Sequence, residues 1–262
     1  MKEKWSWLRN NSSFEGQVKD IRTVSEKLIP FPELENVFGK SWLESYINNS
    51  FFPFSRQRLG ELEVAIREMK NVSGFEEWRN NITTNLREFD SYDFEIREIF
   101  KLAKLADYIE LYPPTDKGSF SELKVSRNNI EFYVEMTKFR EVSNPKNKIK
   151  KLIEEKGIRK IPKNSVGFIY VDTSNVTLRE DIGVKNGEYY CKVISNIDFL
   201  TKEVPQNFRG KNTRVLGIVF IEYYLTKTYD YPLVMTGENI CITPNRFNKL
   251  NYDVKKLKDL IL

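Results

Sequence analysis

The chain has no histidine among its 262 residues. Serine–histidine–aspartate and cysteine–histidine catalysis are therefore excluded, and so is any metal site with a histidine ligand. Cysteine is almost absent too, because Cys191 and Cys241 are the only two and they form no C-x-x-C pair of the kind that holds zinc. Enzyme chemistry in this protein must come from carboxylates, lysines, hydroxyl groups or a metal ion held by oxygen atoms.

Long apolar runs are also missing. No stretch approaches the ~18 apolar residues that cross a bilayer, and the first residues, MKEKWSWLRNNSS, lack the apolar segment of a secretory signal. We therefore expect a cytoplasmic protein with reduced cysteines and no contact with membranes. The net charge of +5 permits nucleic-acid binding but does not demand it.

The patterns that are present predict an α/β fold. Residues 1–88 favour helices, and all four tryptophans lie there as expected core anchors; the helices are expected at 17–28, 34–47, 58–70 and 75–86. From about Asp90 helices alternate with apolar strands. Helices are expected at 92–108, with Ser91 as N-cap, and at 144–155, 197–202 and 254–262; strands are expected at 109–111, 122–125, 131–137, 165–172, 189–193, 215–225 and 239–243. We therefore expect a helical N-terminal region at 1–88 and an α/β core at 89–262.

The segment SELKVSRNNIEFYVEMTK, residues 121–138, predicts a β-hairpin. Asn128 and Asn129 form its two-residue turn, because asparagine tolerates the positive φ that such turns need. Apolar residues then face one another on one side of the hairpin, which supports this register, since a slip by one residue would mix the two faces. On the other side Glu122 faces Glu135.

Two carboxylates in this position repel each other, because their Cβ atoms lie roughly 4.5–5.5 Å apart. The pair needs a lysine, a shared proton or a divalent cation as a neutralising partner. Mg²⁺ prefers carboxylate oxygens together with water and backbone carbonyls. The alternative is a solvated pair at the sheet edge, flanked by Lys124 and Lys138.

The order of elements resembles that of the PD-(D/E)XK nuclease superfamily, over about Tyr92 to Asp172 and more loosely to Asn245. The segment YIELYPPTDKGSFSELKV looks like the approach to the first acid of that family, with Glu122 in the place of an aspartate. YVEMT looks like the second strand, with Glu135 as the second acid. The resemblance implies a restriction-endonuclease-like core, a mixed sheet flanked by helices.

Members of this superfamily often carry another acid on the helix before the sheet. Glu95 is the preferred candidate, because it shares a helix side with Ile99 and Leu102 and so faces the core. Glu98 is the second choice. The alternative for both is an acid near a helix start, stabilised by the helix dipole.

One residue of the family pattern is missing. The superfamily places a lysine two residues after the second acid, whereas position 137 is a threonine, which cannot supply a positive charge. Lys124 could substitute from the acidic face of the hairpin. Lys138 is next in sequence, although strict alternation turns it to the opposite face unless a bulge re-aims it.

The resemblance implies a nuclease that depends on Mg²⁺ or Mn²⁺ and acts on phosphodiester bonds of DNA or RNA. Glu122 and Glu135 would hold the metal, with Glu95 acting through water and the carbonyl of Met136 as a further ligand. The metal would lower the pKa of a bound water. A structure in which the two glutamates converge with a lysine nearby would favour this hypothesis.

Two other hypotheses remain. The missing lysine supports a catalytically inactive protein of the same fold that binds nucleic acid or serves in assembly. The chain could also be an unrelated α/β protein. The basic stretches 146–151 and 159–163 could contact phosphates or form solvated helix faces. The helical region could recognise DNA, form a homodimer or complete the core.

Overall fold

The computed structural model describes residues 31–49, 54–84, 89–115, 118–185, 188–208, 213–227 and 234–262. The chain divides into two compact units, Met1–Lys70 and Asn71–Leu262. The helix expected at 17–28 lies outside the described residues, as do Trp5 and Trp7. The helix predicted at 75–86 belongs to the second unit, and a domain boundary at residue 88 stays a prediction.

The first unit is helical where it is described. Its helices are α3 (Pro32–Phe38), α4 (Lys40–Asn49) and α5 (Phe54–Met69). A single helix was predicted over 34–47, but Gly39 adopts φ 84° and separates α3 from α4, a backbone state that glycine reaches without strain. The carboxylate of Glu63 accepts hydrogen bonds from the backbone N–H groups of Glu33 and Leu34 at the start of α3, at 3.1 and 2.9 Å.

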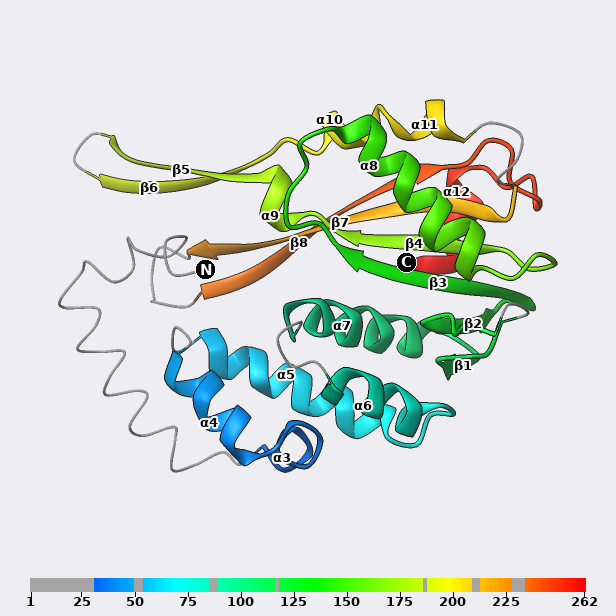
Figure 1. The fold of residues 1–262 in the computed structure, drawn as a ribbon. Coiled ribbons are helices and arrows are strands. Elements are labelled where there is room, and N and C mark those ends of the chain that lie inside the picture. Colours follow the sequence, from blue (N-terminus) through cyan, green and yellow to red (C-terminus); the bar gives the residue numbers. More distant parts are fainter. Residues whose placement is uncertain are drawn as a thin grey trace. The chain divides into compact units, whose positions relative to one another are not determined.

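The second unit is built on a six-stranded mixed sheet in the order β1-β2-β3-β4-β7-β8 (Figure 1). The first three strands are antiparallel neighbours, β4 and β7 run parallel to β3, and β8 is antiparallel to β7. A separate ribbon is made of β5 and β6. The strands are β1 (Tyr108–Leu111), β2 (Leu123–Arg127), β3 (Ile130–Lys138), β4 (Gly167–Asp172), β5 (Leu178–Lys185), β6 (Glu188–Ser195), β7 (Val215–Lys227) and β8 (Val234–Pro244).

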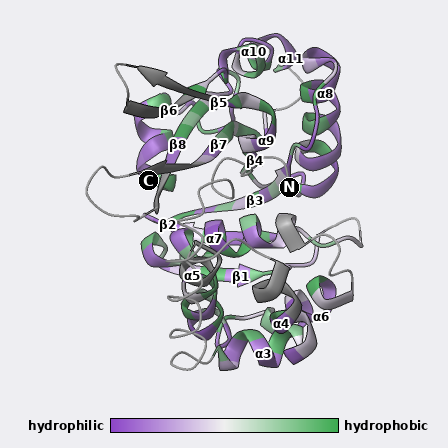
Figure 2. Ribbon diagram, turned by 90° about the vertical axis from the view of Figure 1, so that its left-hand side faces the viewer, coloured by the Kyte–Doolittle hydropathy of each residue, from purple (hydrophilic) through white to green (hydrophobic). Residues whose placement is uncertain are grey.

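Helices cover both faces of this sheet (Figure 1). The helices of the second unit are α6 (Phe75–Thr84), α7 (Phe89–Leu105), α8 (Pro145–Leu152), the π-helix η2 (Ile153–Ile158), α9 (Ser174–Thr177), α10 (Asp198–Thr201), α11 (Val204–Asn207) and α12 (Val254–Ile261). On one face Ile149 of α8 joins Ile169 and Val171 of β4 in a buried cluster. On the other face α7 packs, and the ring of Phe94 meets that of Tyr223 at 6.3 Å. Hydrophilic residues mark much of the length of α8 in Figure 2.

The predicted hairpin is confirmed. Asn128 and Asn129 have φ 54° and 62° at the turn, and Leu123 pairs with Val134 as the predicted register requires.

The prediction that Ser91 caps the helix was wrong, because α7 begins at Phe89 and includes Ser91. No described helix combines the length and the apolar character that a membrane crossing needs.

The fold prediction is thus confirmed at the level of an α/β protein with a mixed sheet, flanking helices and a helical N-terminal region.

Candidate active site

Glu122 and Glu135 converge at the edge where β2 begins. The backbone N–H of Glu122 donates to Glu135 Oε1 at 3.3 Å, and the hydroxyl of Ser121 donates to the same oxygen. In return, Glu122 Oε2 accepts a hydrogen bond from the backbone N–H of Met136. The two glutamates are therefore fixed by reciprocal bonds between the strands, as their predicted position opposite each other requires.

The positive charge that neutralises this pair comes from Lys156. Its ammonium donates to Glu122 Oε1 and lies 3.9 Å from Glu135 Oε2. The side chain of Glu135 has no exposed surface, whereas those of Glu122 and Lys156 are 17% and 25% exposed. Lys156 thus contacts both acids, and it lies where the buried core meets solvent.

The position of Lys156 follows from how its helix packs on the sheet. Lys156 lies in η2, which follows α8 directly, next to the buried Gly157. Gly157 then allows close approach, because a Cβ there would lie 2.5 Å from Val215 Cγ2. This stretch is a π-helix, a form that is rare and frequent at functional sites.

Glu95 reaches the same region from α7. It is 7% exposed and accepts a hydrogen bond from Nε1 of Trp78 at 3.0 Å. A further bond from Tyr112 favours its charged form, and the Tyr112 hydroxyl is itself held by the side-chain amide of Asn81 at 2.8 Å. Glu95 lies close enough to the glutamate pair for the charges of Glu122 and Lys156 to act on it, and its role at the site stays a prediction.

Burial controls the protonation of this cluster. Desolvation raises the pKa of Glu135 to about 8, helped by the negative charge of Glu122 and opposed by Lys156. The pKa of Glu95 also rises to about 8, first through burial and then through the charge of Glu122. Burial alone would lower the pKa of Lys156, but the charges of Glu122 and Glu135 outweigh it, so that pKa lies above its ordinary value. Near neutral pH Lys156 is therefore charged, and the carboxyls of Glu95 and Glu135 are largely protonated.

The other predicted residues lie elsewhere. Lys124 pairs with Glu131 at 3.0 Å, and Lys138 pairs with Asp172 at 3.2 Å on the opposite face of β3, as strict alternation requires. Neither is brought to the glutamate pair.

Glu98 belongs to a second polar group, in which Lys101 and the hydroxyl of Tyr223 donate to it.

Lys156 was not predicted as a site residue. The helix was expected at 144–155, and no local signal marks the next residue, because its approach to the acids depends on how η2 packs on the sheet. Ser121 and Trp78 were missed as well. Ser121 belongs to the predicted hairpin, where its position beside Glu122 was the signal that could have identified it, whereas the contact of Trp78 with Glu95 joins two helices and has no local pattern.

Two observations bear on a metal ion. Within the described ranges no three acidic or cysteine side chains are grouped closely enough to hold one, so Glu95 is not placed as a third ligand. Glu135 Oε2, however, is buried and accepts no hydrogen bond from any described residue.

Comparison of the chain with protein-family models, curated proteins and solved structures found no match.

Proposed function

We propose that this protein is a metal-dependent nuclease of the restriction-endonuclease-like class that hydrolyses phosphodiester bonds of DNA or RNA. The observation that carries the proposal is the contact of Lys156 with both Glu122 and Glu135. It supplies the positive charge that Thr137 cannot supply from the strand. The element order α7-β1-β2-β3-α8-β4, with β4 parallel to β3, supports the same class.

The residues fit a hard divalent cation of the magnesium type, which proteins bind through one or two carboxylates together with substrate oxygens. Glu122 and Glu135 would hold it. The carbonyl of Met136 would add a ligand, since N–H and C=O of one strand residue point the same way and this N–H points to Glu122. When bound, the ion would lower the pKa of a water molecule and polarise the phosphate.

The residues of the chain contribute the remaining chemistry. In hydrolysis a water oxygen bonds to phosphorus and the bond from phosphorus to one ester oxygen breaks, which leaves a phosphate monoester and a hydroxyl end. Lys156 stays protonated and stabilises the negative charge that builds up on the phosphate oxygens. Glu135 Oε2, which accepts no hydrogen bond from any described residue, would be ionised when it holds the cation; the proton that the water loses passes to solvent, and the leaving oxygen takes a proton from solvent.

A second candidate is a nucleic-acid-binding protein without catalysis. It is favoured by the direct hydrogen bond between Lys156 and Glu122, which neutralises the acids without any metal. This candidate predicts binding in the absence of cleavage.

A cleavage assay separates the two candidates. Fluorescent DNA and RNA, each single-stranded and double-stranded, are incubated with Mg²⁺, Mn²⁺ or EDTA. Glu135→Gln and Lys156→Met should each lower the cleavage rate roughly 100-fold or more, and EDTA should abolish it. Two matched controls, Glu131→Gln on the same strand and Lys124→Met, should keep full activity.

Cleavage by Glu135→Gln at the rate of the unmodified protein would overturn the assignment. Binding of every substrate with no cleavage under any metal condition would favour the second candidate.

A further inference from the structure

An exposed aromatic residue lies two positions before Glu122 in the chain. Phe120 is 40% exposed and precedes Glu122 by two residues. Its backbone is held in place, because Phe120 pairs with Pro114 in an antiparallel bridge and the N–H of Ser121 donates to the carbonyl of Pro113 at 3.0 Å. Phe120 is thus an apolar side chain presented to solvent on a fixed loop.

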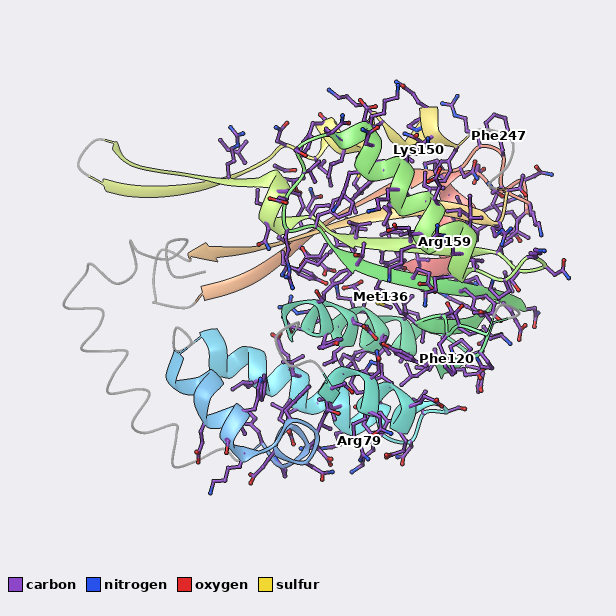
Figure 3. The ribbon with its side chains drawn as sticks, in the orientation of Figure 1. Arg79, Phe120, Met136, Lys150, Arg159 and Phe247 are labelled. Atoms are coloured by element: carbon purple, nitrogen blue, oxygen red, sulfur yellow. The ribbon has the colours of Figure 1, made fainter. Side chains whose placement is uncertain are left out.

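The same loop is tied to the helix that carries Lys156. Lys160, one helical turn after Lys156, donates from Nζ to the carbonyl of Phe120 at 2.9 Å. The positive charge of Lys160 is close enough to the acids to lower the pKa of Glu135, although burial raises it more. Arg159, labelled with Phe120 in Figure 3, is exposed on the same helical segment. Lys160 therefore links the backbone of Phe120 to the helix of Lys156 and brings a second positive charge to Glu135, and Arg159 is its neighbour in sequence.

This combination suits one class of ligand. Bases stack on aromatic rings whatever their sequence, while lysine and arginine contact the phosphates. In a duplex the faces of the internal bases are already stacked on their neighbours, so a ring at the site can stack only on an unpaired base or on the outer face of a terminal pair. We propose that the site binds unpaired nucleotides, in single strands, loops or frayed ends, and that Phe120 is the stacking platform that sets this preference.

This inference rests on the proposed function for its choice of ligand, but its test is a binding measurement without cleavage. The probes are a fluorescent single-stranded oligonucleotide, as DNA and as RNA, and the same sequence as a blunt duplex, all in EDTA. The unmodified protein should bind the single strands more tightly than the duplex. Phe120→Ala should weaken single-strand binding roughly 5- to 100-fold and leave duplex binding unchanged.

Two variants serve as controls. Phe120→Trp keeps a ring and should keep the affinity for single strands. Phe247→Ala removes another exposed phenylalanine, 55% exposed and located after β8, and should change nothing. Thermal unfolding of all variants checks that the loop change leaves the fold intact.

Duplex binding as tight as single-strand binding, or equal losses on both probes in Phe120→Ala, would overturn the inference. Single-strand binding that depends on Phe120 would support it even if no cleavage occurs, in which case the nuclease proposal fails alone. Cleavage together with unchanged binding in Phe120→Ala would support the nuclease proposal and refute the role of Phe120 as a stacking platform.

Discussion

Replacement of Lys156 by methionine should destabilise the protein in a way that depends on pH. Methionine keeps much of the side-chain length and removes the ammonium that donates to Glu122 and lies 3.9 Å from Glu135 Oε2. The variant therefore leaves two carboxyls facing each other without their positive partner. One of them, Glu135, has no contact with solvent.

The size of the effect follows from the geometry. Opposite charges 3.9 Å apart attract by roughly 4 kcal/mol at an effective dielectric constant of about 20. Removing one partner of a fully buried pair costs about 3–5 kcal/mol, but Lys156 is 25% exposed and Glu122 17%, so solvent screens part of this. We expect a loss of about 2–3 kcal/mol in the free energy of unfolding at pH 8.5. At pH 5.5 Glu135 holds a proton, and the loss should fall to about 1 kcal/mol.

Urea unfolding at the two pH values measures both losses. The matched control is Lys124→Met, because Lys124 pairs with Glu131, whose side chain is 63% exposed, and such surface pairs contribute about 0–1 kcal/mol. A Lys156→Met variant that loses no more stability than Lys124→Met at pH 8.5 would refute the reasoning. So would a loss of equal size at both pH values.

Other consequences can be tested in the same way. The pKa values of the buried glutamates lie near 8 instead of 4.5, so their contribution to stability is full below about pH 4.5 and is lost as pH rises through 8. Unfolding free energy should fall over this range, and Glu135→Gln should flatten the fall; an unchanged slope would contradict the pKa shift. Gly157→Ala should lower the free energy of unfolding in urea by about 1–3 kcal/mol, whereas Gly60→Ala, where a Cβ has open space, should be neutral or stabilising. Equal effects of the two substitutions would argue against the close packing of the π-helix. Thr137→Lys added to Lys156→Met should restore part of the lost stability and of any cleavage, because residue 137 shares the strand face of Glu135. A double variant that is no more stable or active than Lys156→Met would show that a lysine at 137 cannot replace the lysine at 156.

Much of the fold could be predicted because its signals are local. Alternation and turn chemistry placed the hairpin and its register, since only one pairing keeps the apolar residues together. The break between α3 and α4 was missed because Gly39 sits inside a run with helical spacing. The strand β5 was also missed, in a stretch whose pattern was unclear.

The site residues, too, could be predicted where the signal is local and not where it depends on packing. The glutamate pair was predicted because both acids belong to one hairpin, where register alone decides which residues meet. The lysine was assigned to Lys124, which lies on the acidic face of the hairpin, or to Lys138, which is next in sequence to Thr137. Such reasoning could not predict Lys156. Its position next to the acids depends on the phase of a helix and on the packing of that helix against β4 and β7.

The origin of the lysine on a helix changes what controls the charge at the site. A lysine at position 137 would be carried by the same strand as Glu135 and would be fixed by the sheet. Lys156 is instead placed by the packing of η2, which Gly157 brings so close that a Cβ would collide with Val215. Any change that lifts this helix from the sheet therefore withdraws the positive charge from both glutamates and raises the pKa of the buried Glu135 further. The charge state of the glutamates is therefore coupled to the packing of this helix on the sheet. A variant that loosens the helix should lose function before it loses the fold.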